Sequence, residues 1–223
     1  TNDETSTLIF WVDQGPKVTV NRLSFRGNKS FPQWAPMNFG TTIEGSSEWK
    51  SLPGRTFPGS IYSEAILAED LDRLRVFYRG RGFRDAEVEL AEARPSRDGT
   101  SVDLTILVVE GPRYEVTKVS VLHLDTDGQP ATEPYYAPDL LEPLLEVEAG
   151  QFYDREAIQR DRLRIERFYA QRGHPVAGRY GAASQGDRTF FQVEQEPLEV
   201  FDLEKPEVEL TYLIREGQPK RLR

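Results

Sequence analysis

The chain has no cysteine, a single methionine and only two histidines, His123 and His174. Without thiols it can form neither a disulfide framework nor a thiolate metal site. The two histidines stand 51 positions apart, which matches no histidine metal motif, so no metal site is expected. No apolar run approaches the roughly 20 residues that a membrane-spanning helix needs.

Basic residues are fewer than acidic ones, with 28 lysines and arginines against 37 aspartates and glutamates, which gives a formal net charge of −9. A surface built to neutralise phosphates would need the opposite balance, so no nucleic-acid partner is expected. Aromatic residues make up 11% of the chain, more than a disordered segment carries. A length of 223 residues then favours two folded domains.

Catalytic motifs are missing as well. No serine is flanked by the glycines of a nucleophile elbow. Gly80 and Gly82 lie at the end of a predicted helix rather than between a strand and a helix start, so they do not form a nucleotide fingerprint. We therefore predict that the chain is not an enzyme and holds no cofactor, with a small α+β hydrolase as a remote alternative.

Two segments repeat one helical register without a gap. In the first, the pattern is formed by Tyr62, Leu67, Asp70, Leu74, Tyr78 and Gly82, and in the second by Tyr153, Ile158, Asp161, Ile165, Tyr169 and Gly173. The apolar spacing predicts one buried stripe on each helix, and the glycines suit a helix end in left-handed geometry. Because Asp70 and Asp161 occupy equivalent positions, repetition explains this pair better than catalysis does.

Strands surround the two helices in the same order. Apolar runs that end in a polar residue and glycine occur at 8–16, 102–112 and 208–217. The first two runs are followed by alternating strands, 18–25 and 114–121, whose phase shifts near Asn21 and Thr117 as a β-bulge would require. Residues 137–145 predict a short helix before the second long one. Two excursions, 31–60 and 182–206, interrupt this scheme.

The resulting order of strand, two helices, strand and strand resembles the polypeptide-transport-associated (POTRA) module. The resemblance rests on Arg22–Asn28 after the first strand, on Tyr78–Phe83 after the main helix, and on the shared register. It implies an α+β fold of tandem β-α-α-β-β modules, each a three-stranded mixed sheet with helices on one face. The implied domains are the terminal strand of a preceding module, 1–17, and two POTRA modules, 18–112 and 113–223.

The likeness is to the modules of BamA-like proteins, and it implies the periplasmic region of an outer-membrane β-barrel assembly protein. The expected partners are unfolded outer-membrane proteins, accessory assembly subunits, and a C-terminal membrane β-barrel of the same polypeptide. The expected mechanism is β-augmentation, in which an extended client adds itself to a sheet edge. A two-partner secretion transporter and an FtsQ-like division protein use the same module and remain alternatives.

By this resemblance, the client-binding edge strands are 83–93 and 176–183. Their predicted contact residues are Phe83, Ala86, Val88, Leu90, Val176 and Tyr180. An edge rich in charge could equally be protected against pairing, so both interpretations stay open. Trp34 and Trp49 either tuck the first excursion onto its own domain or form a partner patch.

Three further segments have both a functional and a structural interpretation. The arginines between 73 and 84 suit a solvated helix face better than an acidic partner. Residues 125–128 suit a plain turn better than a calcium loop, because the further acidic ligands are missing. Leu8–Val12 are apolar on consecutive positions, and we expect residues 7–14 either to add to a sheet edge or to drive self-association.

Overall fold

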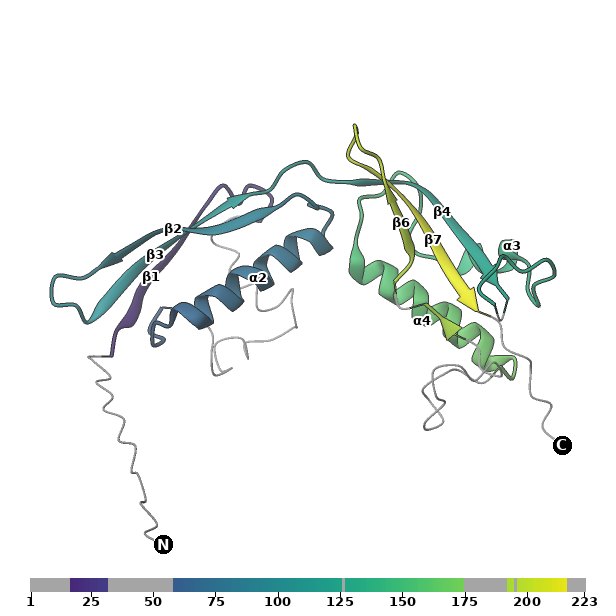
Figure 1. The fold of residues 1–223 in the computed structure, drawn as a ribbon, viewed down its shortest axis with the longest axis horizontal. Helices are drawn as coiled ribbons and strands as arrows, with labels where there is room; N and C mark the ends of the chain where they lie inside the picture. The colour runs from purple at the N-terminus through teal and green to yellow at the C-terminus, as the bar shows by residue number, and fades with distance from the viewer. Residues whose placement is uncertain (1–16, 32–57, 126, 175–191, 195, 216–223) are drawn as a thin grey trace, which may run out of the picture. The chain divides into compact units, whose positions relative to one another are not determined.

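A computed structural model describes residues 17–31, 58–125, 127–174, 192–194 and 196–215 (Figure 1). These residues form two compact units. Unit 1 takes the described residues up to Leu74 together with Val88–Val109, and unit 2 takes Arg75–Glu87 and the described residues from Glu110 onward. The segment 75–87 therefore groups with unit 2, and the predicted domain boundaries 18–112 and 113–223 stay a prediction.

Unit 1 is built on a sheet of three strands in the order β1-β3-β2. β1 (Thr19–Arg26) runs parallel to β3 (Ser101–Val109). β2 (Glu87–Pro95) precedes β3 directly, and the Ser96 amide donates to the Ser101 carbonyl at 2.8 Å to close the turn between them. The parallel pair is possible because a long segment with a helix separates its strands in the chain.

α2 (Glu64–Gly80) lies along one face of this sheet (Figure 1). Leu67, Leu74 and Tyr78 of the predicted stripe are buried, and Leu71 is partly buried. In β3 every second residue is buried, which is the period of a strand with one face against a core. The buried side chains of β3 are Val102, Leu104, Ile106 and Val108.

The sheet of unit 2 places β7 in the centre. β4 (Glu115–Leu124) runs parallel to β7 (Glu207–Arg215) on one side. On the other side, β5 (Gln192–Val193) and β6 (Leu198–Phe201) both run antiparallel to β7. The sheet thus counts four strands rather than the predicted three, because two short pieces share one edge.

The helices of unit 2 cover one face of that sheet (Figure 1). α3 (Pro138–Leu141) continues into the 3-10 turn η2 (Glu142–Leu144), which confirms the predicted short helix. α4 (Arg155–Gln171) begins at Asp154, whose side chain accepts hydrogen bonds from the Glu156 and Ala157 amides as an N-cap. The core between α4 and the sheet includes Ile158, Ile165, Tyr169, Leu210, Tyr212 and Ile214.

The predicted bulges occur where the alternation changes phase. The β1–β3 register shifts between Val20 and Arg22, and the β4–β7 register shifts between Val116 and Lys118. An extra residue in each outer strand reverses which side chains face the core. Without that reversal, the buried residues at the two ends of β4 would lie on opposite faces.

Gly82 and Gly173 follow the two long helices with φ angles of +92° and +84°, as the sequence predicts for a helix end. Gly82 meets a second constraint, because a Cβ at this position would lie 3.0 Å from the Tyr153 carbonyl oxygen. Its own carbonyl accepts from the Tyr114 amide at 2.8 Å. Close backbone approach and positive φ both require glycine here.

Asp161 is fully buried and acts as a structural acceptor. Its carboxylate accepts from the backbone amides of Glu146 and Val147 at 2.7 and 3.0 Å. It also accepts from the Tyr212 hydroxyl at 3.1 Å and pairs with Arg164 at 3.0 Å. Asp70, at the equivalent place in α2, pairs with Arg73 at the same i,i+3 spacing. Both aspartates therefore have a structural role that explains their repetition.

Several predictions lie outside the described residues: the terminal strand with residues 7–14, the edge strand 176–183 with Val176 and Tyr180, and Trp34 and Trp49. In the part of the chain that the structure describes, no helix has both the length and the apolar character needed to cross a membrane.

Candidate functional site

The outer edge of β1 is covered where the strand begins. The chain between Gly59 and Tyr62 runs beside it, with the Val20 amide donating to the Ser60 carbonyl and the Tyr62 amide donating to the Val18 carbonyl, both at 2.8 Å. Backbone groups bonded in this way are not available to a further strand. An incoming polypeptide therefore meets an occupied edge at this end of β1.

β4 is covered at both ends. At its start, the Val116 amide donates to the Gln151 carbonyl, and the Gly150 amide donates to the Val116 carbonyl, each at 2.8 Å. Toward its end, the Ala131 amide donates to the His123 carbonyl, also at 2.8 Å. In both units the strand on the parallel side of the sheet is thus shielded by the chain's own loops.

The edges on the other side of the two sheets, beyond β2 and β6, are not covered in this way among the described residues. β2 is the last strand on its side of the first sheet, and no other strand of the described residues pairs with its outer edge. The strand begins at Glu87, four residues later than predicted, because residues 83–86 form a turn in which the Ala86 amide donates to the Phe83 carbonyl at 3.1 Å. This open edge is the candidate functional site of unit 1.

The predicted contact residues of this edge mostly face inward. Phe83, Ala86 and Val88 are buried, and Leu90 is partly buried. Glu87 and Glu89, between them, are exposed. A client added at β2 would therefore meet the strand's backbone and its acidic side chains, while the apolar residues hold the strand on the core.

In unit 2 the open edge is carried by β6, with β5 beyond it. β5 ends opposite Ile214 of β7 and β6 begins opposite Thr211, so Tyr212 and Leu213 lie outside both paired registers. Pro197 lies directly before β6 and has no amide hydrogen to give to a ladder. Leu198 and Val200 of β6 are 51% and 54% exposed. The edge of unit 2 is accordingly short, interrupted and apolar on its outer face.

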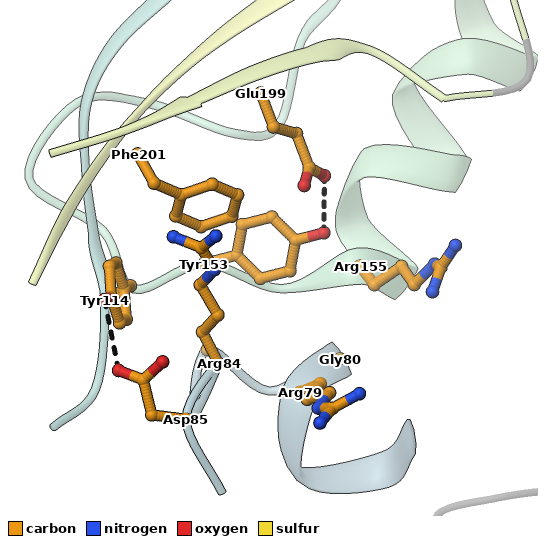
Figure 2. A pocket seen from close by; sticks show the side chains of 10 residues that line it. Arg79, Gly80, Arg84, Asp85, Tyr114, Tyr153, Arg155, Glu199 and Phe201 are labelled. Atoms are coloured by element: carbon orange, nitrogen blue, oxygen red, sulfur yellow. Dashed lines mark hydrogen bonds between the residues drawn. The ribbon is translucent and has the colours of Figure 1, made fainter. Parts of the chain in front are cut away.

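A cavity of about 440 Å³ lies in unit 2 beside β6 (Figure 2). Its lining is formed by Arg79, Gly80, Gly82, Arg84, Asp85, Tyr114, Tyr153, Arg155, Glu199 and Phe201. All of these residues belong to unit 2, and Glu199 and Phe201 come from β6 itself. This cavity could not be predicted from local sequence patterns, because its residues come from four separate segments.

Two tyrosine hydroxyls donate hydrogen bonds to the two carboxylates that line this cavity (Figure 2). The Tyr153 hydroxyl donates to Glu199 Oε1 at 2.7 Å, and the Tyr114 hydroxyl donates to Asp85 Oδ2 at 3.2 Å. Burial and the neighbouring Glu199 raise the pKa of Tyr153 above its ordinary value. The Tyr153 hydroxyl therefore keeps its proton and remains a donor at neutral pH.

The arginines around α2 are not all a solvated helix face. Arg73 pairs with Glu69 at 3.0 Å and with Asp70 at 2.7 Å. Arg81 reaches Asp154 and Glu156, both at 3.0 Å, which sequence spacing could not reveal because the partners stand more than 70 positions away. The Arg84 guanidinium lies over the Phe201 ring, 4.0 Å from its centroid.

The two weaker metal candidates prove to be structural. Asp125 Oδ1 accepts from the Asp127 and Gln129 amides at 2.9 and 2.8 Å, which makes the predicted plain turn. His123 bonds the Tyr169 hydroxyl at 3.1 Å, and the ring of His174 packs edge-on against Tyr169. Among the described residues, no cluster of three potential metal-ligating side chains occurs.

The chain is similar to known proteins. A family profile described as POTRA, surface antigen variable number repeat, matches residues 41–111. The outer membrane protein assembly factor BamA of Neisseria meningitidis serogroup B is 26% identical over 147 residues, which cover 66% of this chain and 17% of that protein. The chain carries POTRA domains related to those of BamA.

A second BamA sequence and a solved BamA structure are also similar to this chain. The outer membrane protein assembly factor BamA of Buchnera aphidicola is 25% identical over 163 residues, which cover 73% of this chain and 24% of that protein. A crystal structure of POTRA domains 3–5 of Haemophilus influenzae BamA superposes with a TM-score of 0.50 at 19% identity, covering 93% of this chain and 70% of that one. These matches confirm the predicted α+β fold of tandem POTRA modules. The chain spans less than a quarter of the length of the two BamA relatives.

Proposed function

We propose that this chain is the periplasmic POTRA region of an outer-membrane protein assembly factor and that it receives unfolded outer-membrane polypeptides or accessory assembly subunits by β-augmentation. It acts as a binding module, without catalysis and without a cofactor. The relation to the POTRA domains of BamA supports the setting. The membrane-embedded part of the same polypeptide is its further proposed partner.

The observation that carries the mechanism is the asymmetry of the sheet edges. Loops of the chain bond to the outer backbone of β1 at its start and of β4 near both ends, whereas among the described residues no loop hydrogen bond reaches the outer edge of β2 or β6. An exposed edge offers a row of amide and carbonyl groups that an extended chain can pair with whatever its side chains are. Such tolerance suits a receptor for many different clients.

The charges on β2 set a limit on what this edge accepts. Glu87 and Glu89 are exposed, and Glu92 pairs with Arg94 on the same strand. Charged side chains on an edge discourage the pairing of a folded protein's own edges. An unfolded strand can still pair, because its backbone approaches without a second charged sheet behind it. We infer that the charges select against self-association rather than against clients.

A proline scan of β2 tests the mechanism. Amide groups of neighbouring residues in a strand point to opposite sides, so one of Glu89→Pro and Leu90→Pro removes an outward donor. The variant that retains the fold should bind a labelled ten-residue peptide of alternating valine and threonine roughly 3- to 10-fold more weakly by fluorescence anisotropy. Glu89→Gln keeps the backbone donor and serves as the matched control.

Equal peptide affinity for the folded proline variant and the unsubstituted chain would refute β-augmentation at β2. Circular dichroism identifies which proline variant retains the fold. Loss of binding in Glu89→Gln as well would show that the carboxylate rather than the backbone makes the contact.

A further inference from the structure

Two of the three arginines that line the cavity beside β6 form no ion pair with a carboxylate of the described residues. Arg155 pairs with Glu196, whereas Arg79 and Arg84 have no carboxylate partner among the residues that the structure describes. The two carboxylates that line the cavity, Asp85 and Glu199, accept hydrogen bonds from tyrosine hydroxyls instead. Such a site stands out in a chain with a formal net charge of −9. Unpaired guanidinium groups in a concave site favour an anionic ligand.

Arg84 is held in a geometry suited to that ligand. Its guanidinium stacks on the Phe201 ring at 4.0 Å, and Figure 2 shows it rising from the segment next to Asp85 toward that ring. A contact with the face of a ring uses none of the N–H donors of the guanidinium, so they stay available to a ligand. Because the contact already restricts the side chain, less side-chain entropy is lost when hydrogen bonds to a carboxylate form.

The cavity adjoins β6, the strand at the open edge of unit 2. Phe201, on which Arg84 rests, is the last residue of β6, and Glu199 lies two residues before it. No described strand pairs with the outer side of β6. An extended polypeptide that adds to β6 would therefore run past the Arg84 guanidinium, with Leu198 and Val200 exposed beside its path.

We propose that this cavity is a carboxylate site that anchors an extended polypeptide added to β6, with Arg84 as the main donor and Arg79 as the second. This inference rests on the proposed function, since it requires strand addition at β6. The carboxylate can be an acidic side chain or the end of the chain, which present the same planar anion. Either source would fix the register of a client that backbone pairing alone leaves free to slide.

The composition of the cavity favours a carboxylate over the phosphate of a lipid headgroup. Asp85 and Glu199 share the lining with the two unpaired arginines. A singly charged planar anion can approach Arg84 edge-on with limited repulsion from these acids. A phosphate group carries more negative charge and would meet stronger repulsion.

The test is a binding titration of the whole chain with ten-residue peptides of alternating valine and threonine. One peptide has an aspartate side chain and an amidated end, a second has a free carboxylate end only, and a third has neither. Arg84→Gln should weaken binding of at least one carboxylate peptide roughly tenfold or more and leave the neutral peptide unchanged. Arg84→Lys should restore part of the affinity, because it retains the charge without the planar fork.

Arg167→Gln is the matched control, because Arg167 is an exposed arginine on α4 and the same charge is lost. Comparable loss in Arg167→Gln and Arg84→Gln would attribute the effect to net charge and overturn the proposal. If the neutral peptide binds and the carboxylate peptides bind no better, the carboxylate site is wrong while β-augmentation stands. If no peptide binds, the proposed function fails together with the site. Arg84-dependent binding to vesicles of anionic phospholipid without peptide binding would overturn the proposal in favour of a lipid.

Discussion

In unit 1 the strand beside the central β3 runs for nine residues without interruption, whereas in unit 2 the same place beside β7 is shared by β5 with two residues and β6 with four. The parallel partners, β1 with eight residues and β4 with ten, share the position of the bulge and a loop bonded beside the start of the strand. Divergence between the two units therefore concentrates on the edge that an outside strand can reach.

This contrast suggests different roles for the two edges. β2 offers a longer ladder, and its exposed side chains are charged. β6 offers a short ladder with two exposed apolar residues, and it adjoins the cavity that Arg79 and Arg84 line. A short ladder forms few hydrogen bonds, so a side-chain anchor contributes relatively more there. Substitutions can test the core that the two units share separately from the edges in which they differ.

The largest expected effect concerns the interior of unit 2. Asp161→Ala leaves the Glu146 and Val147 amides and the Tyr212 hydroxyl without their acceptor, and it removes one of the two carboxylates that pair with Arg164. Removing one partner of a buried charged network costs about 3–5 kcal/mol of unfolding free energy. Urea denaturation followed by circular dichroism measures the loss. Asp139→Ala, at an exposed position of α3, is the control. Similar small losses in both variants would contradict the structural role of Asp161.

A second substitution pair compares the helix stripes directly. Leu74→Ala in α2 and Ile165→Ala in α4 each remove a buried side chain from equivalent repeat positions and should cost about 2–5 kcal/mol. Ile165 is fully enclosed and Leu74 is 8% exposed, so the larger loss is expected for Ile165. Hydrogen exchange of the α2 and α4 amides reports each helix separately. A loss below about half a kcal/mol at either position would mean that the core face is misplaced.

A third prediction concerns Gly27, the residue that directly follows β1 in unit 1. In unit 1, Gly27 has a φ of +83°, and a Cβ there would lie 2.1 Å from the Val108 carbonyl oxygen. Gly27→Ala should destabilise unit 1 by about 1–3 kcal/mol through strain and this clash. Hydrogen exchange of the β1 and β3 amides measures the effect. Unchanged protection would show that the loop after β1 relaxes to accept the alanine side chain.

The smallest expected effect is electrostatic. Hydrogen bonds from Arg160 and Arg164 lower the pKa of Glu146 from 4.5 to about 2. Because the folded pKa lies below the ordinary one, this stabilising contribution is complete above pH 4.5 and is lost as the pH falls toward 2. The stability difference between the unsubstituted chain and Glu146→Gln should therefore be constant near neutrality and shrink in acid. A difference that stays constant down to pH 2 would contradict the ion-pair assignment.

The interior of both units could be predicted from the sequence because periodic burial leaves a local record. The stripe through Leu67 and Leu74 and the phase changes near Asn21 and Thr117 appear in the helix and bulges of the structure. The resemblance predicts a strand from Phe83 onward, but Phe83 and Ala86 are buried at the two ends of a turn. Local pattern does not distinguish a buried turn from a buried strand.

The site beside β6 could not be predicted because its contacts join distant parts of the chain. Arg84 and Phe201 stack although more than 100 positions separate them, and Tyr153 meets Glu199 across 46 positions. The interruption at 194–197 leaves only a proline as a local sign. Edges are defined by the absence of a neighbour, which sequence periodicity does not encode.

The most direct test of the central claim is hydrogen exchange of the whole chain, resolved to single amides, with and without a saturating unfolded outer-membrane polypeptide. β-Augmentation predicts new protection at every second amide of β2 between Glu87 and Pro95, because only outward amides gain a partner. Protection of a shorter run is expected at β6, between Leu198 and Phe201. Protection confined to α2 and α4, with the amides of β2 and β6 unchanged, would show that clients bind the helices and would contradict the account.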